Sequence, residues 1–427
     1  MTSNSSSRPP TGLLYSSQNV KAAQVARWLC QKHIMISSAG SFFTYKNGHY
    51  QRTPDQEIKK LILFEIGDWL SKYKLNEIFS FMETIAHINE NSLNNHSYLN
   101  LKNGLLNLNT LKLEAHSSLI YSTIQLKVTY NPSSTCLKWL KTLSEIFENS
   151  PEIINLLQEF FGLCLTPESK FEKALILLGE GANGKSLLLF ILQKILGEDN
   201  YSSIPLEKFN NLHYLANLFG KLANISIETS AKSEVYDGTF KAVTSGDDIT
   251  VDHKFGKPFK FRPFSKLILA ANNMPRVDDK TDGFFRKLII IRIKKRFSEK
   301  EQNKNLKFEL LDELDGIFFW MLQGWEQLRK RGYFDLPLAV KQEIEEYRVD
   351  NNTTLAFLDE KSSFRADYTV LKGDLYAEYS SWCALNGYFR TGKRKFGKEL
   401  QRHFPQVTED KLNKGHTWIG LTINKGA

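Results

Sequence analysis

The stretch from Ala174 to Gly197 constrains the fold of this chain more strongly than any other part of the sequence. It begins with a short apolar run, ALILL, which predicts a buried strand. A glycine-rich loop, GEGANGKS, comes next. The apolar run after it has helical spacing and ends at Gly197, as helices often end at glycine. Strand, glycine-rich loop and helix in this order are typical of a phosphate-binding loop, whereas a chance glycine-rich turn would not have these flanks.

The residues of this loop have the chemistry that a nucleoside triphosphate requires. Glycines without side chains let backbone N–H groups surround a phosphate, and the helix amino terminus adds a partial positive charge. We expect Lys185 to reach the β- and γ-phosphates and the Ser186 hydroxyl to ligate Mg²⁺. The predicted nucleotide-binding residues are consecutive: Gly179, Glu180, Gly181, Ala182, Asn183, Gly184, Lys185, Ser186 and Leu187.

Length, charge and cysteine content exclude several classes of protein. A chain of 427 residues predicts two to four domains. A formal net charge of +9 favours an anionic partner, although it is also compatible with plain solubility. The four cysteines lie far apart, which argues against a disulfide framework or a zinc site. No signal peptide or membrane span is evident, so we expect a soluble, cytoplasmic protein without a membrane partner.

Apolar strands separated by helical segments predict an α/β fold around the phosphate-binding loop. Further strands are expected at 222–227, 267–271 and 288–293, and such runs are typical of a parallel sheet. Glu228 and Asn272 follow the first two of these strands. We expect both at the ligand-binding edge, because sites in such folds lie at the carboxyl ends of strands.

Two basic elements suggest DNA as the anionic partner. Residues 250–261 predict a β-hairpin with a basic tip containing Lys254 and Lys257. Near the C-terminus, three helices followed by a strand pair describe a winged helix. Its third helix carries Arg394, Lys395 and Lys398, which we expect to face DNA. The alternatives are a solvated turn for the hairpin lysines and a solvated helix face for the C-terminal cations.

The order of these elements resembles the superfamily 3 helicases of viruses, phages and plasmids. More closely, it resembles the phage and plasmid primase-helicase family and its relatives in large DNA viruses. The resemblance extends from about residue 16 to the C-terminus. The segments that carry it are LNLKNGLLNLNT, FFGLCLTPESKFEKALILLGEGANGKS, ANISIE, TSGDDITVDHKFGKPFKFRPFSKLILAANNMP and DGFFRKLIIIRI.

The resemblance implies roles for individual residues in ATP hydrolysis. Lys185 and Glu228 are both implied to be catalytic. Glu228 would be the acid that polarises the attacking water, and it would help Ser186 to hold Mg²⁺. Asn272 becomes the sensor of the γ-phosphate. No aspartate adjoins Glu228, so the sequence does not identify the second Mg²⁺ ligand.

The resemblance also implies a ring. Arg286 would reach the ATP of a neighbouring subunit as an arginine finger, with Arg276 as the rival for this role. Lys254 and Lys257 would point into the DNA channel. The implied assembly is a homo-hexamer on single- and double-stranded DNA, working in the host cell of a mobile element.

The residues before the phosphate-binding loop contain no Asp-x-Asp pair and no His-hydrophobic-His pair. We therefore expect a helicase without its own priming or nicking activity, and a primase or polymerase as a separate chain.

The predicted architecture is an AAA+-type P-loop NTPase core, with an N-terminal mixed α/β and helical region and a C-terminal winged-helix domain. The predicted function is an ATP-dependent replicative DNA helicase of a phage, plasmid or mobile element. Two alternatives stay open, an ATP-switched DNA-binding initiator and a P-loop small-molecule kinase. The predicted boundaries are a disordered tail at 1–15, an α/β domain at 16–140, an ATPase domain at 141–335, a linker at 336–352 and a winged-helix domain at 353–427.

Overall fold

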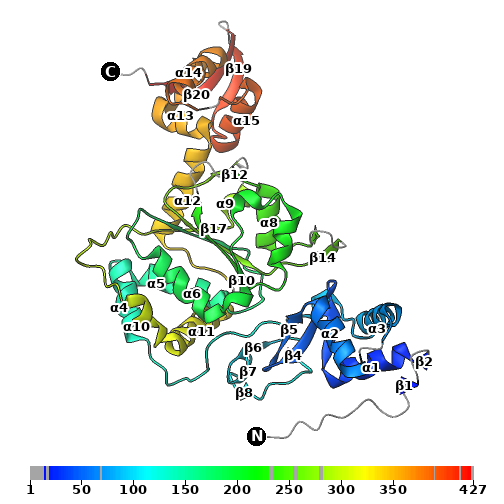
Figure 1. The fold of residues 1–427 in the computed structure, drawn as a ribbon. Coiled ribbons are helices and arrows are strands. Elements are labelled where there is room, and N and C mark those ends of the chain that lie inside the picture. The colour runs from blue at the N-terminus through cyan, green and yellow to red at the C-terminus, as the bar shows by residue number, and fades with distance from the viewer. Residues whose placement is uncertain are drawn as a thin grey trace.

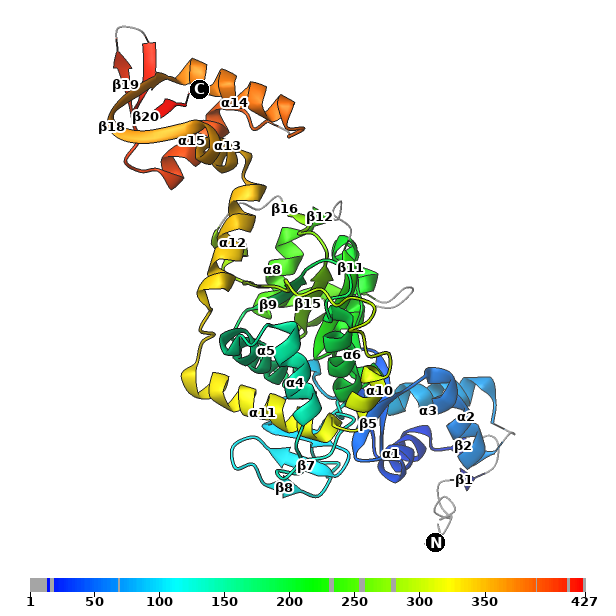
Figure 2. The ribbon, with the colours of Figure 1, turned by 90° about the vertical axis from the view of Figure 1, so that its left-hand side faces the viewer.

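The chain folds into an N-terminal α/β unit, a central unit and a C-terminal unit, as Figures 1 and 2 show. The structure is a computed structural model. It describes residues 14–15, 19–67, 70–229, 234–252, 258–277, 282–388, 390–412 and 415–424. Separate clusters of buried apolar side chains form the cores of these units.

The N-terminal unit packs helices against an antiparallel sheet of order β3-β4-β5. Asn47 and Gly48 form the turn between β4 and β5, and both have a positive φ, 51° and 86°, as a two-residue hairpin turn of this kind requires. Gly67, with a φ of 123°, ends α2. The elements are β1 (Leu14–Tyr15), β2 (Asn19–Val20), α1 (Ala22–Lys32), β3 (Met35–Ser38), β4 (Ser41–Lys46), β5 (His49–Thr53), α2 (Asp55–Ile66) and α3 (Lys72–Ile85).

A small antiparallel sheet connects the N-terminal and central units. It consists of β6 (Tyr98–Leu101), β7 (Gly104–Asn107) and β8 (Leu113–Glu114). Leu99, Leu101 and Leu106 are buried in the central hydrophobic core and not in the N-terminal one. The domain boundaries stay predictions, but the packing of this sheet joins it to the central unit.

The central unit is built on a parallel sheet of order β10-β11-β15-β9-β17. Alternate residues of β9 belong to two different apolar clusters, so both faces of the sheet are covered. The apolar strands predicted from the sequence are confirmed. Their bounds are β9 (Ala174–Leu178), β11 (Ala223–Thr229), β15 (Lys266–Ala271) and β17 (Leu288–Arg292). The short edge strand β10 (Tyr201–Ser202) was not predicted.

Helices cover the two faces of this sheet. On one face, α5 and α11 approach so closely that a Cβ on Gly162 would lie 2.3 Å from the Met321 carbonyl oxygen. This face carries α4 (Leu137–Ile146), α5 (Pro151–Leu163), α6 (Lys185–Leu196), α10 (Leu306–Leu311) and α11 (Leu314–Arg331). The other face carries α7 (Leu212–Leu215), α8 (Asp237–Ser245), α9 (Asp282–Phe285) and the hairpin β13 (Ile249–Val251) and β14 (Phe259–Phe261). A short parallel pair joins β12 (Glu234–Val235) to β16 (Arg276–Val277).

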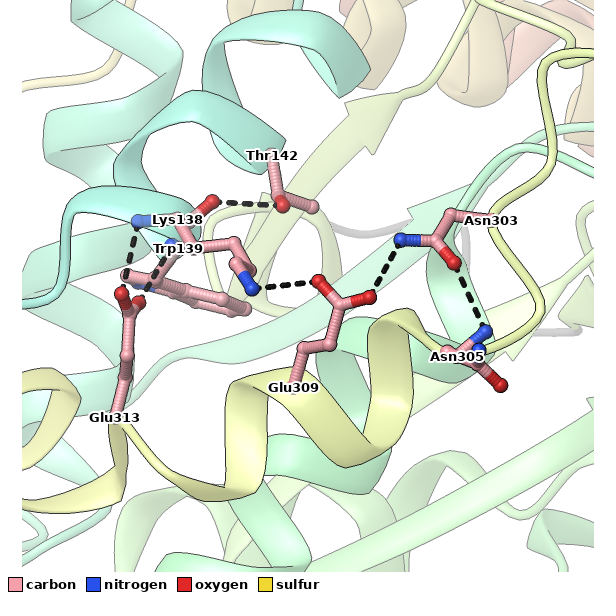
Figure 3. Close-up of polar contacts among 7 residues, drawn as sticks. All are labelled: Lys138, Trp139, Thr142, Asn303, Asn305, Glu309 and Glu313. Carbon is pink, nitrogen blue, oxygen red and sulfur yellow. Dashed lines mark hydrogen bonds and ion pairs between the residues drawn. The ribbon is translucent and has the colours of Figure 1, made fainter.

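Polar contacts join α4 to the helices that follow β17 (Figure 3). The Glu313 carboxylate accepts the backbone N–H groups of Lys138 and Trp139 at 3.0 and 2.9 Å, and so caps the amino terminus of α4. Glu309 accepts from Lys138 Nζ at 2.5 Å and from Asn303 Nδ2 at 3.0 Å. These contacts hold α10 and Glu313 against α4. They therefore anchor the C-terminal end of the segment that runs from β17 past the phosphate-binding loop.

The C-terminal unit stands beyond α12 (Leu338–Asn351), which separates it from the central sheet in Figure 1. The predicted three helices and final strand pair are present. A ten-residue strand, β18, was not predicted, and it completes a sheet of order β18-β20-β19. The elements are α13 (Thr353–Lys361), β18 (Ser362–Leu371), α14 (Lys372–Leu385), α15 (Lys393–His403), β19 (Thr408–Leu412) and β20 (Gly415–Ile423).

Candidate functional site

The phosphate-binding loop connects the end of β9 to the start of α6. Gly179 has a φ of 156°, and a Cβ on it would lie 2.7 Å from the Ile293 carbonyl oxygen, so this position requires glycine. The loop is held on two sides. Gly179 N donates to the Ala271 carbonyl at 3.2 Å, and Phe297 N donates to the Ala182 carbonyl at 2.8 Å.

Lys185 lies at the centre of this loop and is 7% exposed. Its ammonium group donates to the Gly179 carbonyl, to Asn183 Oδ1 at 3.2 Å and to Asn272 Oδ1 at 3.4 Å. It also donates to the Glu180 carbonyl at 3.3 Å, so its three protons are shared among four acceptors. Burial lowers the pKa of Lys185. The structure therefore brings together two predicted site residues, Lys185 and Asn272, that are far apart in the sequence.

The loop fits a triphosphate. Gly184, which precedes α6, has no side chain to cap the helix. Among the described residues, the one side-chain acceptor at this end is Asn183 Oδ1, 3.4 Å from Lys185 N, so a phosphate would meet little competition. A Cβ on Gly181 would have nothing within 4 Å, and Asn183 Nδ2 is buried without a hydrogen-bond partner. Among the residues that the structure describes, no group of three His, Cys, Asp or Glu side chains could hold a metal ion. Ser186 is the predicted Mg²⁺ ligand of the loop, and phosphate oxygens, water and the predicted Glu228 would supply the other positions on the ion.

The backbone of Glu228 lies beside this site. Ile227 pairs with Ala270 and Thr229 with Ala271, so the register shifts at Glu228 and leaves a bulge at the end of β11. Bulges often redirect a side chain next to an active site. Asn272 directly follows the end of the neighbouring strand β15. The side chain of Glu228 lies outside the described part of the structure, so its roles in hydrolysis and Mg²⁺ binding stay predictions.

Arg286 is not brought to the phosphate-binding loop of its own chain. It follows α9 and precedes β17, and Leu288 of β17 pairs with Ala174 at the start of β9. Arg286 therefore lies near the amino-terminal end of β9, whereas the loop follows its carboxyl end. At about 3.3 Å per residue, the length of β9 separates Arg286 from the loop by about 15 Å. Its side chain is exposed. The Arg276 side chain is outside the described residues, so the choice between the two arginines stays a prediction.

Contacts from later segments were not foreseen from the sequence. Ile293 N donates to the Leu178 carbonyl at 2.7 Å, and the Arg296 guanidinium lies 3.9 Å from the Glu180 carboxylate. The basic run KKR at 294–296, just after a predicted strand, was the available signal. From α12, the Tyr347 hydroxyl donates to the Pro275 carbonyl at 2.6 Å. This bond ties the linker helix to the loop that follows Asn272.

The predicted DNA-facing residues are described in part. The strands of the hairpin are confirmed, but Lys254 and Lys257 lie outside the described residues. On α15, Phe396 and Leu400 are buried, whereas the side chains of the predicted cations are exposed. These cations are Arg394, Lys395 and Lys398.

Three family models match the chain in sequence order. Residues 23–148 match a family described as D5 N terminal like. Residues 177–287 match a family of unknown function, DUF5906, and residues 349–425 match a family described as Poxvirus D5 protein-like. No helix within the described ranges is long and apolar enough to cross a membrane.

Proteins of large DNA viruses are similar in sequence. A candidate helicase of Acanthamoeba polyphaga mimivirus is 29% identical over 291 residues, which is 61% of this chain and 30% of that protein. A candidate primase of African swine fever virus is 23% identical over 67% of this chain and 33% of its own length. A candidate helicase of Invertebrate iridescent virus 3 is 21% identical over 81% of this chain and 41% of its own length. The chain thus spans about a third of the length of these relatives.

The fold is also similar to solved structures of the NrS-1 C-terminal region. An apo A-form structure gives a TM-score of 0.56 at 13% identity, covering 95% of this chain and 100% of that chain. A second apo structure gives 0.53 at 13% identity, over 94% and 99%. At this identity the likeness concerns the fold alone.

Proposed function

This chain is related to the D5-type primase-helicases of large DNA viruses, and on that premise we propose that it is an ATP-driven DNA helicase that acts in replication. The observation that carries the proposal is the contact between Lys185 and Asn272. Their Nζ and Oδ1 atoms are 3.4 Å apart at the carboxyl edge of a parallel sheet, where α/β proteins bind ligands.

In this proposal, the residues around the loop divide the work of ATP hydrolysis. Bound Mg²⁺ would neutralise charge on the phosphates, held by Ser186 and the predicted Glu228. Lys185 would exchange its loop carbonyls for phosphate oxygens and neutralise developing charge. Asn272, already within reach of Lys185, would report whether a γ-phosphate is present. Glu228 would accept a hydrogen bond from the attacking water.

The site is completed by a neighbouring subunit in this proposal. Arg286 is exposed at the edge of the sheet opposite its own loop, which suits a residue that acts on the next subunit. An arginine that stabilises transition-state charge in trans accelerates phosphoryl transfer by about 10³–10⁵-fold. We therefore propose an AAA+-type core assembled as a homo-hexameric ring, with ATP at the subunit interfaces.

Two further elements would engage DNA. The hairpin β13–β14 would carry Lys254 and Lys257 into the channel of the ring and contact the backbone of a single strand. In the C-terminal unit, α13, α14 and α15 with the sheet β18-β20-β19 have the helix and strand content of a winged helix. The exposed cations of α15 would face duplex DNA.

ATP turnover in the presence of DNA tests this function. We expect single-stranded DNA to raise the ATPase rate of the full chain, and Lys185→Ala to abolish both basal and stimulated rates. A kinase would instead turn over ATP with a small acceptor molecule, and its rate would not respond to DNA. An ATPase rate that is the same with and without DNA would refute the proposal.

A further inference from the structure

A cleft of about 840 Å³ lies at the amino edge of the central sheet, opposite the phosphate-binding loop. Its walls come from residues 90–97, from 166–170 just before β9, and from the base of the hairpin at 261–264. The volume is in the range of ligand-binding pockets. The cleft adjoins the hairpin β13–β14, which would contact DNA in the proposed function.

Aromatic side chains form the apolar part of the cleft. Phe219 and Phe264 line it and are only partly buried, so their rings are available to a ligand. Phe219 is held in place by edge contacts with Phe259 and Phe261, at centroid distances of 5.6 and 5.3 Å. Trp325 adds a buried apolar surface. Rings held in this way are platforms on which nucleobases stack without regard to sequence.

Among the described cations of the rim, Arg329 already donates to the Leu108 carbonyl and to Asn109 Oδ1, at 2.7 and 2.6 Å, whereas Arg262 is only loosely paired. Lys260 pairs with Asp248 at 2.8 Å, whereas Arg262 lies 3.8 Å from the same carboxylate. Glu168, another acid of the cleft, is 3.4 Å from Lys170. Because Lys260 already neutralises Asp248, the Arg262 guanidinium, whose side chain is 67% exposed, can turn to a phosphate.

The cations continue from the cleft along the hairpin. Lys260 lies in β14, and Arg262 is two residues further along, just past the end of this strand, so the two are about 7 Å apart along the chain. Because Lys260 is paired with Asp248, Arg262 is the cation of these two that a phosphate would meet. The exposed amides of Asn91 and Asn95 also line the cleft and offer hydrogen-bond donors and acceptors that base edges can use.

We propose that this cleft binds a nucleotide of single-stranded DNA, with its base against Phe264 and Phe219 and its phosphate on Arg262. The proposal rests on the proposed function, because it supplies a second contact for the strand that the hairpin would move. A free mononucleotide has the same base and phosphate, so the experiment must separate the two sources.

The test uses the full chain and a fluorescein-labelled oligonucleotide of thymidine, with binding followed by anisotropy. Phe264→Leu keeps an apolar side chain but removes the ring, and should weaken binding about fivefold to a hundredfold. Arg262→Gln should weaken binding and lower the slope of log affinity against log salt by about one. Arg27→Gln is the matched control, an exposed arginine on α1 outside the cleft, and should bind like wild type. Circular dichroism checks that each variant is folded.

Cross-linking of an iododeoxyuridine oligonucleotide gives an independent arm, in which we expect adducts within 90–97 or at Phe264. Normal binding by both cleft variants, with adducts elsewhere, would overturn the inference while leaving the helicase proposal intact. Competition by thymidine monophosphate at equal nucleotide concentration would show a free-nucleotide site and also overturn it. A wild-type chain that bound no oligonucleotide at all would contradict the proposed function itself, and this inference with it.

Discussion

The buried amine of Lys266 should make the stability of the central sheet depend on pH. Lys266 begins β15, the strand that leads to Asn272, and is 4% exposed. Its Nζ donates to the Thr166 carbonyl and, at 3.0 Å, to the Phe264 carbonyl. Burial lowers the pKa of Lys266 to about 8, from 10.5 for an unperturbed lysine. The unfolded chain therefore holds this proton more tightly than the folded chain does, and stability falls as the pH drops through this window.

The expected size follows from these two pKa values. As the pH drops from 10 to 7, the tighter proton binding of the unfolded chain lowers the free energy of unfolding by about 2.5 kcal/mol. Lys266→Met keeps the length of the side chain but cannot titrate. The free-energy difference between wild type and Lys266→Met should thus shift in favour of wild type by about 2.5 kcal/mol from pH 7 to pH 10.

Hydrogen exchange of the β15 peptide is the suitable assay, because it reports the opening free energy of this strand rather than of the whole chain. Rates at each pH are corrected for intrinsic exchange. Lys102→Met, a change at an exposed lysine, serves as the control and should show no such slope. A wild-type to Lys266→Met difference that stays constant from pH 7 to pH 10 would refute the reasoning.

Three further changes test the ATP site and its connections. Glu228→Gln should retain ATP binding and lose turnover, because an amide cannot accept the proton of the attacking water; persistent turnover would point to another acid. Tyr347→Phe removes the 2.6 Å bond to the Pro275 carbonyl and should destabilise the chain by about 1–2 kcal/mol, measured as a lower urea midpoint. An unchanged midpoint would show that this bond is not needed. Mixing Arg286→Ala with Lys185→Ala chains should restore part of the ATPase rate that each lacks alone, whereas co-assembled mixtures without recovery would turn attention to Arg276.

The central sheet could be predicted from the sequence because its strands are short, continuous apolar runs. β9, β15 and β17 lie within about a residue of the predicted runs, since strands buried on both faces leave this signature. β18 was missed because its pairing with β20 is long-range and most of its residues are partly or fully exposed, so it shows no such run.

The candidate site was predictable only as separate pieces. The sequence placed Lys185 after one strand and Asn272 after another, but their contact depends on β9 and β15 being neighbours in the sheet. Strand order is decided by packing of the whole unit, and no local pattern encodes it. The same holds for the contact between Arg296 and Glu180, and for the bond from Tyr347 to Pro275.

Strand displacement from a forked DNA duplex tests the central claim most directly. With ATP, the wild-type chain should release the labelled strand. Lys185→Ala, measured at the same amount of bound DNA, should leave the fork intact. If the wild-type chain hydrolysed ATP on this DNA and yet released no strand, the chain would be an ATP-switched DNA-binding protein and not a helicase.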